Sequence, residues 1–99
     1  MVQKIPIGDG DERHGIFSFG RLPECSLHLE HESISRRHAC LAFDKEGAMY
    51  LVDLGSAHGT FLNGERIEAQ RYIELREQDA LKFGESSREY VLLHDKSED

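Results

Sequence analysis

The sequence predicts an all-β fold, built as an antiparallel β-sandwich or barrel. Short segments that alternate apolar and polar residues recur along the chain, and turn sequences separate them at short intervals. Asn63-Gly64 lies between two apolar runs, the arrangement that most strongly indicates a β-hairpin. No window long enough for a helix shows the helical period. Many short strands with regular turns are typical of a sandwich or barrel.

The expected strands are short and follow one another closely. In chain order they are residues 2–7, 16–19, 26–30, 38–43, 48–54, 60–62, 65–67, 72–75, 80–84 and 88–94. Pro6 suits an edge strand, because proline donates no ladder hydrogen bond. Gly47 ends the turn DKEG, at a position that tolerates positive φ, so we expect a hairpin there.

Alternation also predicts which side chains face the core. In segment 38–43 we expect Ala39, Leu41 and Phe43 on one face. In segment 48–54 we expect Tyr50, Val52 and Leu54 on the core face.

Length and composition indicate a single domain over residues 1–99, with an edge strand and acidic loop in 1–15 and a frayed tail in 95–99. Apolar residues make up 38% and charged residues 31%, as in water-soluble globular domains. No run approaches the roughly 18 apolar residues of a membrane span, and no secretory signal is visible. Cys25 and Cys40 are expected to be free thiols, which favours a reducing compartment.

The formal net charge of -7 argues against general binding to nucleic acid or to anionic membranes. Acidic residues gather near the two ends, at Asp9, Asp11, Glu12, Glu98 and Asp99. Cationic residues gather near the loops that end the first strands, at Arg13, Arg21, Arg36 and Arg37. A few arginines at contact distance decide what a site binds, whereas net charge decides long-range steering.

Three loop sequences carry groups suited to holding a tetrahedral dianion. Gly20-Arg21 combines a close backbone approach with a planar guanidinium, although alone it also fits an ordinary surface arginine. The run SISRRH offers the Ser35 hydroxyl, while His38 is either a catalytic base or, as we favour, a structural residue that fixes the loops. The run GSAHGTFLNG places Ala57 and His58 at a loop tip, and a plain hairpin loop is the alternative.

Taken together these sequences resemble the forkhead-associated (FHA) domain, a phosphothreonine-recognition family. Its pattern is Gly-Arg, then Ser-x-x-His, then Gly-Thr and Asn-Gly, met here by Gly20-Arg21, Ser35 and His38, Gly59-Thr60, and Asn63-Gly64. The resemblance covers nearly the whole chain. It implies a sandwich of about eleven short strands, with binding loops at one end.

The resemblance also implies roles for individual residues. Arg21 would pair with the phosphate, Ser35 would donate its hydroxyl to it, and Arg36 would add a contact. Ala57 and His58 would contact the peptide, at positions where the family more often has threonine or serine and asparagine. Asn63 would brace the loop that carries residues 57 and 58. The residues implied to hold the architecture of the site are Gly20, His38, Gly59, Thr60, Asn63 and Gly64.

The run RIEAQRYIELREQDALKFGESSREYVLLH resembles one branch of the family more closely. That branch contains Smad nuclear-interacting protein, Dawdle and the yeast pre-mRNA leakage protein; kanadaptin and the nuclear inhibitor of protein phosphatase 1 are also similar. The resemblance implies a module that binds a phosphothreonine-containing protein in nuclear RNA processing, and we expect it to be a monomer. If not nuclear, a cytoplasmic location is expected. No membrane or direct nucleic-acid partner is expected.

Two alternatives remain. The domain could bind proteins through a sheet face without regard to phosphate. It could instead be an enzyme or a metal site, since it has six histidines. No spacing matches a standard zinc signature, and no nucleophile–base–acid set is evident, so we expect no catalytic residue, metal or cofactor.

Overall fold

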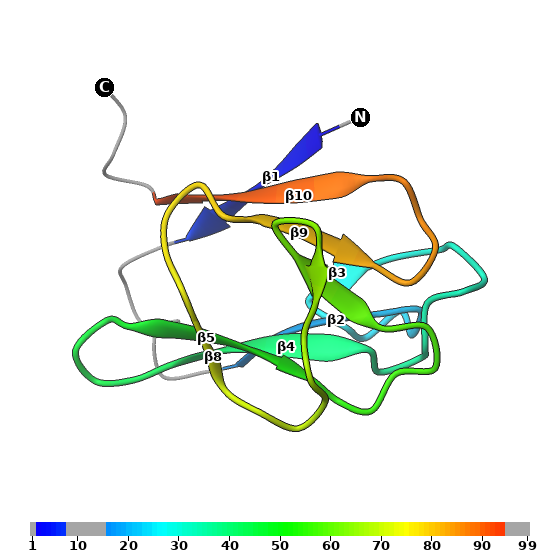
Figure 1. Ribbon diagram of the computed structural model, residues 1–99, viewed down its shortest axis with the longest axis horizontal. Coiled ribbons are helices and arrows are strands. Elements are labelled where there is room, and N and C mark those ends of the chain that lie inside the picture. The colour runs from blue at the N-terminus through cyan, green and yellow to red at the C-terminus, as the bar shows by residue number, and fades with distance from the viewer. Residues whose placement is uncertain (1, 8–15, 95–99) are drawn as a thin grey trace.

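Two five-stranded β-sheets pack face to face in the computed structural model, which describes residues 2–7 and 16–94 (Figure 1). One sheet has the order β1 (Val2–Ile7), β10 (Glu89–His94), β9 (Ala80–Phe83), β6 (Thr60–Leu62), β7 (Glu65–Arg66). The other has the order β3 (Leu27–His28), β2 (Ile16–Gly20), β4 (Ala39–Phe43), β5 (Met49–Asp53), β8 (Ile73–Leu75). The expected acidic loop, Arg13 and the expected frayed tail lie outside the described residues.

The predicted all-β sandwich is confirmed, and the described residues form ten strands. Most neighbouring strands pair antiparallel, but β1 pairs with β10 in parallel and β2 pairs with β3 in parallel. The β2–β3 overlap consists of Phe19 opposite Leu27 and Gly20 opposite His28. Only two residue pairs form this parallel contact, so the six residues 21–26 are enough to connect the end of β2 to the start of β3. Pro6 lies on the edge strand β1, as predicted.

The core between the sheets is a single cluster of apolar side chains. Its buried members are Phe19, Leu29, Ile34, Ala39, Leu41, Met49, Leu51, Leu75, Leu81, Phe83 and Tyr90. The rings of Phe19 and Phe83, which come from opposite sheets, have centroids 4.6 Å apart. This contact joins the two layers close to the end of β2, where Gly20 begins the first loop of the predicted site.

Ala39, Leu41 and Phe43, which we predicted to share one face of β4, all lie in or against the core cluster, but the predicted core face of β5 is wrong. Met49 and Leu51 belong to the core cluster, whereas Tyr50 and Val52 do not and Leu54 is 40% exposed. Asp53 therefore takes the inward position that the alternation of polar and apolar residues assigned to solvent, and it is 3% exposed. A carboxylate is stable there because neighbouring groups donate hydrogen bonds to it, which an alternation pattern cannot register.

Both predicted hairpin turns are confirmed. Asn63 and Gly64 have φ of 51° and 89°, the two positive values that a type I′ turn requires. Gly47 has φ of 93° in the β4–β5 turn, where the Asp44 carboxylate accepts hydrogen bonds from the amides of Glu46 and Ala48.

The two cysteines are buried and free, as predicted. Burial raises the pKa of the Cys40 thiol, which keeps it protonated. The described part of the chain contains no helix with the length and apolar character needed to cross a membrane.

Candidate functional site

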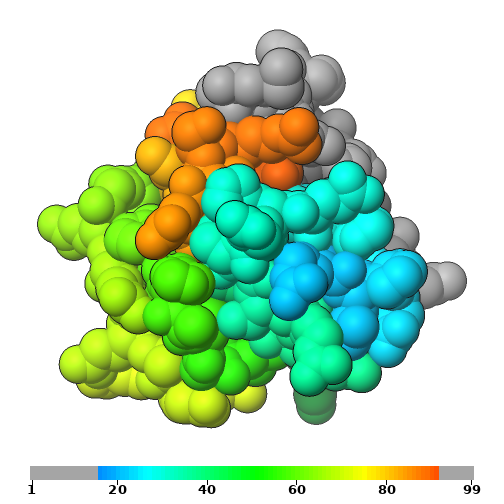
Figure 2. All heavy atoms as spheres, turned by 90° about the vertical axis from the view of Figure 1, so that its right-hand side faces the viewer, coloured from blue at the N-terminus to red at the C-terminus, as the bar shows by residue number. Residues whose placement is uncertain are grey.

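Loops from distant parts of the sequence meet at one end of the sandwich, which we call the rim. It comprises residues 20–22, 31–38, 54–59 and 84–86, at the right of Figure 1 and facing the viewer in Figure 2. The Arg21 amide donates to the Ser35 carbonyl at 3.2 Å, and the Ala57 amide donates to Ser35 Oγ at 3.3 Å. The Gly84 amide donates to the Gly59 carbonyl at 2.8 Å. The predicted loops are therefore neighbours in space.

Arg21 begins the loop after β2 and is exposed. Its Nε donates to the Ile34 carbonyl at 2.6 Å, which holds the guanidinium against the loop 31–38. Among the described residues no carboxylate forms an ion pair with Arg21. A guanidinium fixed by Nε alone can still present a planar fork to two oxygens of a ligand.

Gly20 allows the loops after β2 and before β4 to touch. A Cβ at this position would collide with the Arg36 carbonyl oxygen and lie 2.9 Å from Cys25 Sγ. The Arg36 carbonyl also accepts the Leu22 amide at 3.3 Å. The Arg36 side chain is exposed, and it too lacks an ion pair within the described part of the chain. Only glycine at position 20 lets these two segments approach so closely.

Ser35 has one unused hydrogen-bond donor. Its backbone amide donates to His38 Nδ1 at 3.0 Å, and its Oγ accepts from the Ala57 amide. Because Oγ acts as an acceptor in this contact, the hydroxyl proton is left to donate elsewhere. Ser35 is half-buried, next to the exposed Ala57 and Arg36. Its hydroxyl therefore suits an acceptor that lies outside the chain.

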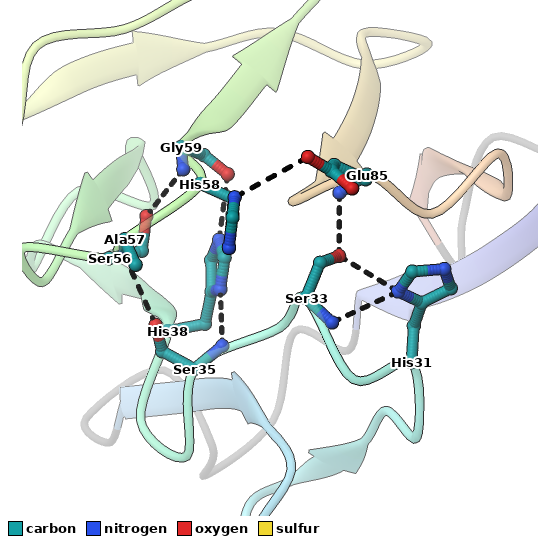
Figure 3. Close-up of polar contacts among 9 residues, drawn as sticks. All are labelled: His31, Ser33, Ser35, His38, Ser56, Ala57, His58, Gly59 and Glu85. Atoms are coloured by element: carbon teal, nitrogen blue, oxygen red, sulfur yellow. Dashed lines mark hydrogen bonds and ion pairs between the residues drawn. The ribbon is translucent and has the colours of Figure 1, made fainter.

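His38 ties two loops together and is fully buried (Figure 3). Its Nδ1 accepts from the Ser35 amide, so Nε2 carries the proton and donates to the Gly59 carbonyl at 2.8 Å. Burial lowers the pKa of His38, although the Gly59 carbonyl and the Asp53 charge act in the opposite direction. With both ring nitrogens occupied by backbone groups, His38 has no free nitrogen for proton abstraction.

Asp53 organises the loop 54–59 and escaped the sequence reasoning. Its Oδ1 accepts from the hydroxyls of Ser56 and Thr60, both at 2.6 Å, and its Oδ2 accepts from the amides of Gly55 and Ser56, both at 3.1 Å. Burial disfavours the ionised carboxyl, but these hydrogen bonds outweigh it and hold the pKa of Asp53 below its usual value. The sequence signal was an aspartate at a strand end with Gly55-Ser56 two and three residues later, a spacing typical of an Asx turn.

Thr60 and Gly59 are buried behind the loop tip, whereas Ala57 and His58 are exposed at it. Ser56 Oγ also accepts the Gly59 amide at 2.9 Å, so one serine closes the loop from inside. Gly59 has φ of 90°, a left-handed conformation that favours glycine. The tip residues are thus held by a rigid base and present their outer surface to solvent.

Asn63 does not bond the loop that carries residues 57 and 58. Its Oδ1 accepts from the Ala80 amide at 2.9 Å, and its Nδ2 donates to the Asp79 carboxylate at 3.1 Å. Asn63 and Gly64 therefore brace the β6–β7 turn against the start of β9. Their effect on the rim is indirect, through the position of β6, which begins at Thr60.

The turn 84–86 is a further part of the rim that the sequence reasoning missed. Ser33 Oγ accepts the Glu85 amide at 2.7 Å and contacts His31 Nδ1 at 2.8 Å (Figure 3). The carboxylate of Glu85 lies 3.5 Å from His58 Nδ1, across the gap between this turn and the loop tip. The contact between Ser33 and Glu85 joins residues 52 positions apart, and no local sequence pattern indicates it.

The comparison with known families fits this geometry. The model of the FHA domain matches residues 17–84, more than half of the chain. The chain belongs to the FHA family. The resemblance expected from the three loop sequences is therefore confirmed.

FHA proteins of several organisms are similar in sequence. Mouse Smad nuclear-interacting protein 1 is 49% identical over 71% of this chain and 21% of that protein. FHA domain-containing protein DDL of Arabidopsis thaliana is 43% identical over 86% of the chain and 31% of the protein. Human nuclear inhibitor of protein phosphatase 1 is 38% identical over 93% and 26%. The chain spans less than a third of the length of each of these relatives.

Solved FHA structures share the fold. The N-terminal FHA domain of Rad53p from S. cerevisiae, in complex with a phosphothreonine peptide, aligns with a TM-score of 0.68 at 30% identity, over 73% of this chain and 58% of that one. Full-length yeast Pml1p aligns with a TM-score of 0.65 at 30% identity, over 72% and 55%. The FHA family is one of interaction modules rather than of enzymes.

Proposed function

We propose that this FHA domain recognises phosphothreonine-containing segments of a partner protein. The observation that carries the proposal is that Arg21 and Ser35 lie next to each other at the rim, joined through their backbones. The exposed guanidinium is anchored through Nε, and the neighbouring hydroxyl has its proton free. A phosphate dianion offers the oxygens that both groups lack.

In this proposal Arg21 pairs with the phosphate, Ser35 donates its hydroxyl to a phosphate oxygen, and Arg36 adds a further contact. Ala57 and His58, exposed at the loop tip, contact the peptide. The architecture is held by Gly20, His38, Gly59, Thr60, Asn63 and Gly64. Several charge-assisted hydrogen bonds, each contributing roughly 1.5–3 kcal/mol before ordering costs, are consistent with micromolar affinity, about -8 kcal/mol.

We infer that the domain is a monomeric, non-enzymatic module. We infer that it acts in the nucleus, because the names of two relatives describe them as nuclear proteins. A role in RNA processing is supported by the resemblance to the branch that includes yeast Pml1p. The net charge of -7 favours a protein partner over a nucleic acid.

Isothermal titration with a phosphothreonine peptide and its unphosphorylated twin tests the proposal. We expect micromolar binding for the first peptide and none measurable for the second. Arg21→Ala is expected to weaken binding by at least tenfold while the domain stays folded, since Arg21 is exposed. Arg37→Ala is the matched control, because Arg37 is exposed and already paired with Glu24 at 3.2 Å.

Equal affinity for both peptides would contradict phosphate recognition. Equal affinity of wild type and Arg21→Ala for the phosphopeptide would remove Arg21 from the site. A phosphoserine version of the peptide measures what the threonine methyl group adds.

A further inference from the structure

The sheet formed by β3, β2, β4, β5 and β8 has an outer face that is unusually apolar. Strand register aligns Ile16, Ala42, Tyr50 and Glu74 in one row across four strands. A second row contains Ser18, Cys40 and Val52. Since side chains alternate along strands, Leu54 and Tyr72 point to the same side. We call these nine residues the outer face.

Several large apolar side chains on the outer face are exposed to solvent. Three large hydrophobic side chains stand exposed in the described part of the chain: Ile16 at 65%, Leu54 at 40% and Tyr72 at 71%, and all three lie on this face. The Tyr72 ring meets the Tyr50 ring edge-on, with centroids 6.1 Å apart. An antiparallel sheet usually presents polar side chains on the face that does not pack. A patch of tyrosine and aliphatic side chains is instead typical of protein–protein interfaces.

Two residues on the outer face are almost fully covered. Cys40 and Val52 are 9% and 7% exposed, yet neither belongs to the core cluster between the sheets. The apolar surface open to a partner is therefore provided by the exposed side chains of Ile16, Leu54 and Tyr72.

Carboxylates lie close to the Tyr50 end of this patch. Glu74 lies on the outer face, and Asp44 and Glu46 lie in the adjoining β4–β5 turn, which also contains Lys45. Partial burial is the main cause that raises the pKa of the Tyr50 hydroxyl. The negative charges of Asp44, Glu74 and Glu46 raise it further. Within the described residues none of these three carboxylates forms an ion pair. Cationic groups on a partner would therefore find unneutralised carboxylates next to the apolar patch.

The outer face and the rim share only Leu54. In Figure 1 the sheet with β4, β5 and β8 forms the lower layer, and its outer face points away from β1, β9 and β10. The rim lies at the loop end of the strands, so a phosphopeptide there leaves most of the outer face uncovered.

We propose that the outer face is a second docking surface, which binds a segment of a partner protein that presents apolar side chains flanked by lysine or arginine. The partner's apolar side chains pack on Ile16, Leu54 and Tyr72, while its flanking cations meet Glu74, Asp44 and Glu46. The interaction requires no phosphate. It is independent of the proposed phosphothreonine site.

The test uses three unphosphorylated synthetic peptides of equal length and ¹⁵N-labelled protein. The first has a Leu-Ile-Val-Phe centre with two lysines on each side, the second replaces the lysines by glutamates, and the third replaces the apolar centre by serines. We expect only the first to shift the amide resonances of Tyr50, Val52 and Tyr72. Arg21→Ala is expected to leave this binding unchanged, which separates it from failure of phosphothreonine recognition.

Two variants sharpen the result. Tyr72→Ser, at an exposed position, is expected to weaken binding of the first peptide at least about tenfold. Glu74→Lys is expected to weaken it severalfold, whereas the matched reversal Glu65→Lys on β7, in the opposite sheet, is expected to have no effect.

Equal binding of the lysine- and glutamate-flanked peptides, or shifts confined to the rim, would overturn the proposal. So would self-association of the protein alone in sedimentation that Tyr72→Ser abolishes, since the occupant would then be a second copy of the chain.

Discussion

Replacement of His38 by alanine is expected to destabilise this domain strongly. The side chain is fully buried, and both ring nitrogens bond backbone groups, at 3.0 Å to the Ser35 amide and 2.8 Å to the Gly59 carbonyl. Alanine leaves both groups without their partner, at about 1–3 kcal/mol each. It also removes the edge-on contact with Phe83, whose ring centroid lies 5.6 Å away. The total is on the order of 3–5 kcal/mol, a large part of the 5–15 kcal/mol typical of a domain.

Urea denaturation followed by fluorescence or circular dichroism measures this loss. His28→Ala is the matched control, because His28 is exposed and its pairing with Glu30 at 3.9 Å contributes little. Arg21→Ala is expected to cost less than His38→Ala, since it removes one hydrogen bond to the Ile34 carbonyl. A His38→Ala midpoint that equals that of His28→Ala would refute the role of His38 as the tie between the two loops.

Three further predictions follow from buried groups of the rim. Burial lowers the pKa of His38 in the folded state, so the unfolded state binds more protons just below pH 6.5. The free energy of unfolding should therefore decline as pH falls from 6.5 toward the folded pKa. His38→Gln should flatten this decline in urea titrations at several pH values. The pKa of Asp53 is also lowered, so the stability that its carboxylate contributes is present above about pH 3.8 and is lost as pH falls through the folded pKa. Asp53→Ala leaves the hydroxyl donors of Ser56 and Thr60 without their acceptor and should lower the free energy of unfolding by about 2–4 kcal/mol at pH 7, measured by thermal melting. Gly20→Ala should lower both the melting temperature and phosphopeptide affinity, because the added Cβ meets the Arg36 carbonyl; unchanged values in both assays would mean that the two loops can separate freely.

The strands of this fold were predictable because their signals are local. The Asn63-Gly64 turn, the glycine of the β4–β5 turn and the short alternating runs each act within a few residues. The core face of β5 was not predictable from alternation, because Asp53 occupies an inward position. Its four hydrogen bonds come from residues 55–60, and only the folded loop shows that they point at one carboxylate.

The sequence predicted that the motif residues of the candidate site lie together, but it did not predict the contacts that support them. Gly20-Arg21, Ser35 and His38 stand in the order that the family resemblance requires, and the structure brings them together. The contacts that complete the rim join Ser35 to Ala57 across 22 positions and Ser33 to Glu85 across 52. Loop contacts of such separation depend on how the two sheets pack. Sequence periodicity carries no information about that packing.

The negative charge of the whole chain and the proposed binding of a dianion are compatible because the two act over different distances. Interactions between exposed charges are screened beyond about 8 Å at physiological ionic strength, so acids far from the rim mainly slow the approach of a phosphopeptide. At contact distance the relevant cations are those not already paired. Arg37 is paired with Glu24 and Arg71 with Glu68, whereas Arg21 and Arg36 lack such partners among the described residues. The distribution of ion pairs, rather than the net charge of -7, is what makes Arg21 the decisive position to substitute.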